Sequence, residues 1–404
     1  MIGGAQSTSD VGGRNKMATD MLKGVLHRFD PDLFPRLMRE ITGEVMLRYL
    51  RPLADTRAPS QSVPWTRGPV IASLLAADGV LNAPGVSIDT NFEHTGNTVL
   101  TLGDNPRRKR IWLLAHLDEI SYAVYRSEGR RFQLTPLCYH MMEPGRQDGV
   151  VLRYDLRSQR YQPFCDGDIV VESNATVYFE TSTGAILLPG DRVCFQSKMF
   201  YDPTRGIISG SLDDAGGAAA LLVATRFLQP YGLELLLALT DEEEGVGGIG
   251  NQSFCRGGSR LLPYFDQPEL VIDCDIHEAE VMLEGNGPIA FAPGDGASYA
   301  EVSSYGKGVI TPPHLYALVR QLSIDLAPEK IRLRENVGGY LSRSEGVNAM
   351  LRTPNVALLG FVGANRHFQT SATTANLNDL VDLARSVVCL VLLTQTPLWR
   401  EVWQ

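Results

Sequence analysis

Apolar residues recur with helical spacing near both ends of the chain. The segments MATDMLKGVLHRF and PDLFPRLMREITGEVMLRYL carry them at positions i, i+3 and i+4, the spacing that places side chains on one face of an α-helix. A third helix is expected at about 68–77, after a turn rich in Pro and Ser. The segment NLNDLVDLARSVVCLVLL predicts a closing helix. The pattern therefore predicts a chain that opens and closes with helices.

Between these ends, short apolar runs alternate with helical segments. The runs RIWLLAHLDEI, LELLLALT, ELVIDCD and VALLGF are typical of buried strands. The segments SLDDAGGAAALLVATRFLQ and PPHLYALVRQLSIDLA predict helices, as does the region near 250–261. Strands that alternate with helices are typical of a parallel sheet that is covered on both faces. The sequence therefore predicts an α/β fold with a mostly parallel central sheet flanked by helices on both faces.

The pattern changes between about 125 and 201. Short β-rich runs such as GDIVVES, ATVYFET and DRVCFQS are separated there by Gly, Pro, Asn and Ser, which favours a series of short strands. We expect a small all-β domain at 125–201, inserted into an α/β domain that is formed by 1–124 and 202–404. The polar segment 1–16 is expected to be disordered.

The composition is that of a globular protein with few basic clusters. The chain has 404 residues, of which 44% are hydrophobic and 21% charged, and a net charge of -9. It is long enough for a large core and a second domain. No block of Lys or Arg is long enough to indicate a nucleic-acid-binding tail. The most basic stretch, NPRRKR at 105–110, leaves contact with a polyanion as a minor hypothesis.

The cysteines and the apolar runs bear on where the protein works. Six cysteines are scattered without a CxxC pair, which argues against a structural zinc site and a disulfide framework and suits a reducing compartment. The first residues lack the apolar region of a signal peptide. No apolar run approaches the roughly 20 residues that span a bilayer. We expect a cytoplasmic protein with neither a membrane nor a nucleic acid as partner.

Histidines and carboxylates follow five of the predicted strands and corners. Because strands of a parallel sheet end at one edge, these side chains are expected to meet there. Two His and several carboxylates without Cys or Met indicate a divalent-metal site with zinc as the first candidate, and cobalt or manganese next. Two ions bridged by a carboxylate would explain why the four acidic residues 241–244 directly follow the predicted buried strand LELLLALT. The residues are His116 with Asp118, Asp213 with Asp214, Glu242 with Glu243, Asp273 with Asp275, and His367.

Each of these motifs also has a simpler interpretation. His-x-Asp can be a salt bridge, LDD can be a helix N-cap, the acidic run 241–244 can be a solvated loop, and His367 can be a core histidine. Competing motifs are weaker. GVGGIG matches GxGxxG, but three preceding Glu would repel a pyrophosphate. HEAEV fails the HExxH pattern, and neither GxxxxGK[ST] nor GxSxG occurs. The metal hypothesis therefore rests on the five motifs as a set.

The same motifs resemble those of a known family. AHLDEI is similar to a His-x-Asp-Glu-Ile motif, SLDDAGG to Leu-Asp-Asp-Arg-Ala-Gly, and DEEEGVGG to Gln-Glu-Glu-Val-Gly-x-x-Gly. LEGNGPIA and GVNAM also resemble segments of this family, which comprises the co-catalytic dinuclear zinc aminopeptidases of the tetrahedral (TET) and glutamyl aminopeptidase type. That family carries its lid or dimerisation domain where the β-rich insertion falls here. The resemblance covers about 97–393.

The resemblance implies a role for each collected residue. It implies that His116 and Asp273 bind one metal ion and that Glu243 and His367 bind the other. Asp213 would bridge the two ions, and the peptide bond between Asp213 and Asp214 would be cis. Asp118 would orient His116, and Glu242 would be the general base. Asp275 stays open as an alternative to Asp273, because the segment VIDCDIHEA can be shifted by a residue or two.

Several positions depart from the family pattern. Ala215 stands where Arg is frequent, Glu244 replaces Val, and Asn348 replaces Asp. After His367 the sequence continues FQTSATT rather than His-Ser-Pro. These departures affect the expected substrate pocket more than the expected metal ligands.

The predicted function is that of a metallo-aminopeptidase that hydrolyses N-terminal residues of peptides. A metal-bridging hydroxide would attack the first carbonyl, and Glu242 would act as general base. An N-acyl-amino-acid deacylase or carboxypeptidase of the same clan is the nearest alternative, and a non-catalytic binding or scaffold relative is another. The resemblance and the strands of the insertion, which could pair between subunits, lead us to expect a homo-oligomer.

Overall fold

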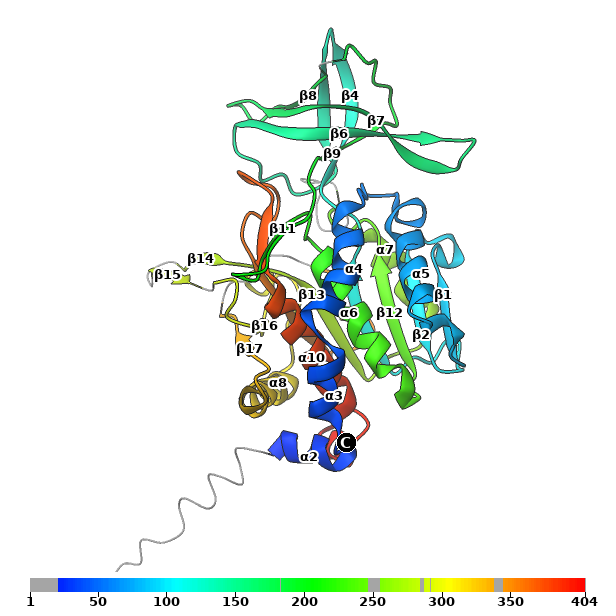
Figure 1. Cartoon of the computed structure of the whole chain (residues 1–404), viewed down its shortest axis with the longest axis vertical. Coiled ribbons are helices and arrows are strands. Elements are labelled where there is room, and N and C mark those ends of the chain that lie inside the picture. The colour runs from blue at the N-terminus through cyan, green and yellow to red at the C-terminus, as the bar shows by residue number, and fades with distance from the viewer. Residues whose placement is uncertain are drawn as a thin grey trace, which may run out of the picture.

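A small β-barrel stands on one edge of a larger α/β domain (Figure 1). The computed structural model describes residues 21–181, 183–245, 255–283, 287–290, 292–337 and 344–403. The predicted disorder at 1–16 and part of the helical region expected near 250–261 lie outside these residues. Among the described residues, no helix has both the length and the apolar character that are needed to cross a membrane.

The α/β domain is built on an eight-stranded sheet. Its four middle strands are parallel to one another, while the pairs β1/β2, β2/β12 and β16/β18 are antiparallel. The predicted mostly parallel sheet is thus confirmed for its centre. In order across the sheet, the strands are β1 (Val86–Asp89), β2 (Thr98–Leu102), β12 (Leu235–Thr240), β3 (Ile111–His116), β13 (Leu270–Glu278), β18 (Val356–Gly363), β16 (Ala297–Ala300) and β17 (Leu333–Glu335).

Helices cover both faces of this sheet, as predicted. Alternate residues of the middle strands enter two separate apolar clusters, with Leu113 in one and Trp112 and Leu114 in the other. Because both faces are buried, the strands are continuous apolar runs. The larger cluster includes α2 (Met21–Phe29), α3 (Leu33–Glu40), α4 (Gly43–Asp55), α5 (Arg67–Ala77), α6 (Ala215–Leu228), α8 (Pro313–Leu326), α10 (Leu377–Leu393) and α11 (Pro397–Trp403); the smaller includes α7 (Arg256–Leu261) and α9 (Gly346–Ala349).

The second predicted helix is divided in two. Helix α3 ends at Glu40 and α4 begins at Gly43. Between them, Thr42 has an extended backbone, and its side chain accepts a hydrogen bond from the backbone N–H of Val45. Such an N-cap starts a new helix, so an apolar pattern that looks continuous is formed by two helices.

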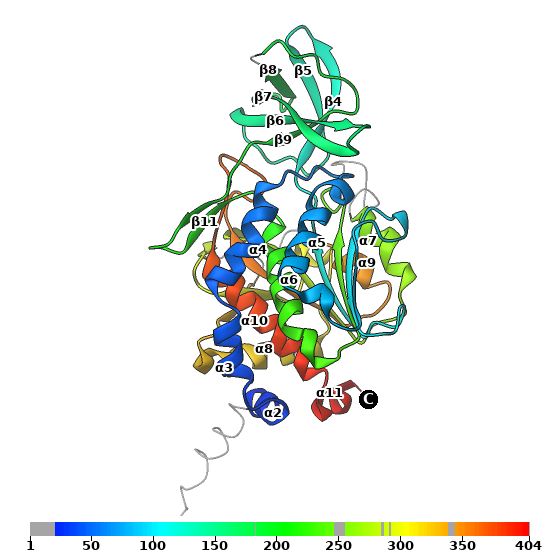
Figure 2. The same ribbon diagram turned by 45° about the vertical axis from the view of Figure 1, so that its right-hand side comes forward.

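The β-rich part of the chain forms a closed barrel with its own apolar core. Its strands run from Ser121 to Phe195, close to the insertion at 125–201 that the sequence predicts. In order around the barrel they are β4 (Ser121–Glu128), β5 (Arg131–Pro136), β8 (Val177–Thr181), β7 (Arg160–Val171), β6 (Gly145–Asp155) and β9 (Arg192–Phe195). Figure 2 shows that the barrel meets the α/β domain at one end only.

Two small sheets complete the description. The strand β11 (Ile207–Gly210) pairs with β10 (Phe200–Asp202) and with β19 (Thr373–Asn376). The strand β14 (Glu280–Leu283) pairs with β15 (Gly287–Ala290). The first sheet joins the return from the barrel to the segment that precedes α10.

Replacement of Gly216 by Ala is expected to destabilise the α/β domain. Gly216 lies in the first turn of α6, and a Cβ atom there would come within 2.5 Å of Cζ of Phe361 on β18. Because overpacked cores lose about 1–3 kcal/mol, we expect thermal denaturation to show a lower apparent Tm. Gly24→Ala in α2 is the control, because its Cβ would meet only Arg28 Nη1 at 3.5 Å, and it should leave the Tm equal or higher. Equal Tm values for wild type and Gly216→Ala would contradict this packing.

Candidate metal centre

The edge of the sheet that faces the barrel gathers most of the predicted site residues. His116 is the last residue of β3, and the chain enters the barrel five residues later, at Ser121. Asp213 directly precedes the N-cap of α6, and His367 follows β18. The carboxyl ends of β3, β12, β13 and β18 are adjacent in the sheet. The predicted convergence at this edge therefore occurs for His116, Asp213 and His367.

Asp213 lies between the two histidines. Its Oδ1 is 3.2 Å from Nε2 of His116, and its Oδ2 is 3.5 Å from Nε2 of His367. Asp275 Oδ1 lies 3.9 Å from His116 Nε2, and Glu244 Oε2 lies 3.5 Å from His367 Nε2. These contacts form two groups that share Asp213: His116, Asp213 and Asp275, and Asp213, Glu244 and His367. The peptide bond between Asp213 and Asp214 is cis, as the resemblance implied.

Backbone carbonyls orient both imidazoles. His116 Nδ1 is 3.0 Å from the carbonyl oxygen of Asp118, and His367 Nδ1 is 2.6 Å from that of Tyr139. A carbonyl only accepts hydrogen bonds, so each ring donates from Nδ1 and directs its Nε2 towards the carboxylates. Such rings are ready to bind a metal ion through Nε2.

Asp118 connects several parts of the site. One of its carboxylate oxygens is 3.6 Å from His116 Nδ1 and accepts a hydrogen bond from the backbone N–H of Glu243 at 3.0 Å. The other accepts one from Ser60 Oγ at 2.6 Å. The Asp118 carboxylate thus lies beside His116, the residue that the resemblance implied it would orient, and it also fixes the backbone of the acidic run.

The acidic run is shifted by one residue relative to the prediction. Glu242, the expected general base, accepts from Arg260 Nη2 at 2.6 Å and pairs with Arg256 Nη2 at 2.8 Å. Glu243, the expected ligand, lies with Oε2 at 3.9 Å from His116 Nε2. Glu244 takes the place beside His367. The two arginines attract Glu242 away from the histidines, and the sequence reading did not consider them.

Asp273 does not lie with the histidines. Its Oδ1 accepts a hydrogen bond from Ser344 Oγ at 2.9 Å, and no group of possible ligands among the described residues includes it. Asp273 and Asp275 point to the same side of β13, but two residues of strand separate them by roughly 6.6 Å. Only Asp275 is far enough along the strand to reach His116. Of the two aspartates that the sequence left open, Asp275 is thus the one that the structure places beside His116.

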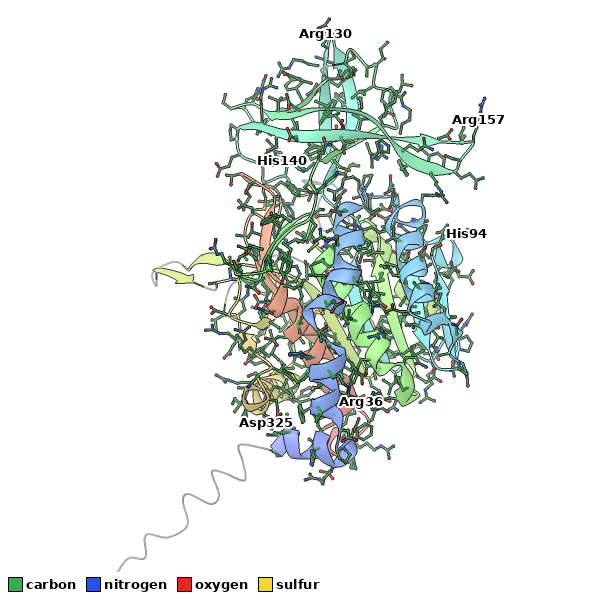
Figure 3. The ribbon with its side chains drawn as sticks, in the orientation of Figure 1. Arg36, His94, Arg130, His140, Arg157 and Asp325 are labelled. Atoms are coloured by element: carbon green, nitrogen blue, oxygen red, sulfur yellow. The ribbon has the colours of Figure 1, made fainter. Side chains whose placement is uncertain are left out.

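The barrel contributes directly to this edge. Besides the carbonyl of Tyr139, Gln147 Nε2 donates to the carbonyl of Phe368 at 2.6 Å. The ring of Phe368 stacks on that of Phe195, with centroids 4.4 Å apart and an interplanar angle of 6°. His140, labelled in Figure 3, follows Tyr139 in the connection between β5 and β6, at the end of the barrel that faces the α/β domain. The segment after His367, which departs from the family pattern, is thus held against the barrel.

The electrostatics of the cluster fit divalent cations. Burial raises the pKa of Glu243 to about 8 and raises the pKa of Glu244 and of Asp214 well above the usual range. Asp213 Oδ2 and Glu244 Oε1 are buried without a hydrogen-bond donor among the described residues. Buried carboxylates without partners are costly unless cations neutralise them. Oxygen and imidazole donors without thiolates suit zinc, cobalt or manganese.

One nearby cation was missed by the sequence reading. Arg366 Nη1 is 3.8 Å from Asp213 Oδ2, and its Nε is 3.0 Å from Glu278 Oε1. The Arg366 side chain is 12% exposed. It lies directly before His367 in the chain, so its proximity to the cluster could have been suspected from that position. A single guanidinium offsets only part of the negative charge of the cluster.

Comparisons with solved structures identify the fold. No family model and no curated protein sequence matches the chain. The TET1 peptidase of Pyrococcus horikoshii is similar, with a TM-score of 0.63 and 17% identity over 85% of this chain and 98% of that chain. An aminopeptidase of Desulfurococcus kamchatkensis has a TM-score of 0.65 at 16% identity, over 86% and 95%. A TET aminopeptidase of a marine sediment Thaumarchaeota archaeon has 0.65 at 14%, over 86% and 96%. The fold that the sequence resemblance implied is confirmed.

Exchange of Asp275 for Asn is expected to reduce metal binding, whereas the same exchange at Asp273 is not. Asp275 contacts His116 and Asp273 does not, so only the first change removes a ligand oxygen from the cluster. Purified Asp275→Asn should hold at least one metal ion fewer per chain by mass spectrometry of metals than wild type. Asp273→Asn is the matched control and should keep the wild-type content. The reverse result would return Asp273 to the ligand set.

Metal-free protein is expected to lose stability as the pH rises from about 6 to 8.5. Glu345 precedes α9 and accepts a hydrogen bond from Thr240 at the end of β12. Burial raises the pKa of Glu243 and of Glu345 to about 8, whereas an unfolded Glu titrates near about 4.3. In this pH range the folded state holds protons that the unfolded chain has released, so raising the pH removes stability. Differential scanning fluorimetry of chelator-treated protein should show a falling Tm, and added zinc should reduce the decrease. A Tm that rises with pH would contradict this assignment.

Proposed function

We propose that the protein is a metal-dependent aminopeptidase, which removes N-terminal residues from peptides with the help of two divalent ions. The observation that carries this proposal is the position of Asp213, which faces both histidines and belongs to two groups of possible ligands. The two aminopeptidases with a similar fold, one of them a TET aminopeptidase, support the choice of reaction. The α/β domain, 1–124 and 202–404, would carry the catalysis, and the inserted barrel would act as its lid.

Each ion would have three ligand residues, one of them shared. His116 and Asp275 would hold one ion, Glu244 and His367 the other, and Asp213 would contact both. Zinc is the first candidate, and cobalt or manganese would also suit these donors. When bound, such ions polarise a carbonyl group and lower the pKa of a water molecule.

Glu243 is the residue that we assign to proton transfer. Its carboxylate is close to His116, while its backbone N–H is held by Asp118. Since Glu244 would serve as a ligand, Glu243 is left to accept the proton of the attacking water and to pass it to the leaving amine. Burial raises its pKa to about 8, and a base with a pKa near the working pH is effective in both steps. Asp118 would orient His116 and Glu243 without contacting the substrate.

Two of the expected roles are therefore reassigned in this proposal. Glu242 would stabilise the start of α7 through Arg256 and Arg260 rather than act as the base. Asp273 would support the segment that contains Ser344. His116, Asp213 and His367 keep the roles that the sequence resemblance implied.

The assembly and location of the protein are also proposals. The Pyrococcus horikoshii peptidase assembles into a tetrahedron or an octahedral shell, and several large apolar side chains of the barrel are exposed here, such as Leu156, Ile186 and Leu188. These observations support a homo-oligomer. All six cysteines are free, which supports a reducing location such as the cytoplasm.

Glu243→Gln is expected to abolish turnover while both metal ions remain bound. The amide cannot accept the proton of the water, and the loss of a general base costs about 10²–10⁴-fold in rate. The measurement is kcat on dipeptides with a free N-terminal amine, with metal content as the second readout. Glu242→Gln is the matched control and should keep kcat within about tenfold.

The opposite pattern, with Glu242→Gln inactive and Glu243→Gln active, would restore the original assignment. Dipeptides with an acetylated N-terminus test the reaction itself. An aminopeptidase hydrolyses the free amine form only, so preferential hydrolysis of the acetylated form would favour a deacylase or carboxypeptidase. Absence of bound metal and of all hydrolysis would favour a non-catalytic relative.

A further inference from the structure

A cavity lies at the edge of the central sheet that is opposite the candidate metal centre. It has a volume of about 960 Å³, within the range of small-molecule sites. Four of its lining residues directly precede the four middle strands: Glu234, Arg110, Glu269 and Asn355 come before β12, β3, β13 and β18. The cavity is therefore at the amino ends of these strands, whereas the candidate metal centre is at their carboxyl ends.

Helix α11 forms another wall of the cavity. Trp399 and Arg400 of this helix line it together with Arg108 of the basic stretch 105–110. Figure 2 shows α11 at the end of the molecule that is far from the barrel. The basic stretch 105–110 is not part of the candidate metal centre, and it contributes to the wall of this cavity instead.

The acidic side chains of the cavity already have basic partners. Glu234 Oε2 is 2.9 Å from Nζ of Lys109, which is buried. Glu269 forms two hydrogen bonds with the guanidinium of Arg110, at 2.6 and 2.7 Å. Both carboxylates of the cavity wall are therefore already paired with basic side chains of the protein.

Two guanidinium groups remain unmatched. Arg108 and Arg400 are exposed, and no described side chain or carbonyl pairs with either guanidinium. The backbone N–H of Arg108 donates to Asn105 Oδ1 at 2.8 Å, which fixes the turn that carries its side chain. Unmatched guanidinium groups at a concave site favour carboxylates or phosphates. Pro354 adds an exposed apolar side chain, and the buried Trp399 and Pro268 complete this part of the lining.

We propose that this cavity binds a small organic dianion, with its charged groups at Arg108 and Arg400 and its apolar part against Pro354. Phosphate esters and dicarboxylates share this chemistry. A concave site of this size encloses a small molecule, and the net charge of -9 disfavours a long polyanion along the surface. Because the cavity is at the edge opposite the metal centre, its ligand is distinct from the peptide substrate, and its binding does not depend on the proposed activity.

Isothermal titration calorimetry with ribose 5-phosphate and with succinate tests the proposal. Metal-loaded wild type should bind at least one of the two compounds, with one molecule per chain. The double variant Arg108→Ala/Arg400→Ala should bind it at least tenfold more weakly. The matched control is Arg130→Ala/Arg157→Ala, which removes two exposed guanidinium groups at the far ends of the barrel (Figure 3) and should bind like wild type.

The two compounds separate the phosphate ester from the dicarboxylate as the preferred class. Asp213→Asn, which is expected to lose metal, should bind the dianion as wild type does, so a failure of the proposed peptidase function leaves this test intact. Absence of binding to both compounds would overturn the proposal. So would equal binding by the Arg108→Ala/Arg400→Ala variant, or binding of single-stranded oligonucleotides in place of the small compounds.

Discussion

Asp213 is shared by two histidines that come from distant parts of the chain, and the geometry of the whole edge follows from its position. It directly precedes the N-cap of α6, a helix that is buried along almost its entire length against the sheet, α4 and α10. The carboxylate is therefore fixed by the core of the domain rather than by a surface loop. The two imidazoles and Arg366 lower the pKa of Asp213, but the other acids beside it remain buried and are costly to ionise unless further cations neutralise them. The core of the domain thus holds a group of carboxylates together at a position where bound cations would offset their repulsion.

The barrel also helps to fix the geometry of this edge, through its contacts with His367 and Phe368. The Nδ1–H of His367 is bound by the carbonyl of Tyr139, which lies in the connection between β5 and β6. The next residue, Phe368, has a positive φ of 51° and packs into the apolar core of the barrel. A ring that is anchored there cannot move independently of His367. The sequence after this histidine therefore makes the orientation of its imidazole depend on the position of the inserted domain.

The sequence was sufficient for the fold and for the edge at which the chemistry gathers, because strand polarity follows from the alternation of apolar runs and helices. His116, Asp213 and His367 each lie next to a well-defined element, so their convergence was predictable. Asp273 and Asp275 share one side of a strand, and alternation alone cannot say which reaches the edge. In the acidic run, the choice among Glu242, Glu243 and Glu244 depends on Arg256 and Arg260, whose distance from the run is set by tertiary packing.

The two edges of the sheet leave opposite charges unmatched. At the carboxyl ends of the middle strands the acids outnumber the bases, and Arg366 alone does not balance them. At the amino ends every acid of the cavity is paired, and the unmatched groups are guanidinium groups. The parallel strands between these edges are apolar and buried on both faces. They therefore separate the unmatched carboxylates from the unmatched guanidinium groups by the length of a strand. One rigid sheet can therefore hold cations at one edge and an anion at the other without either site neutralising the other.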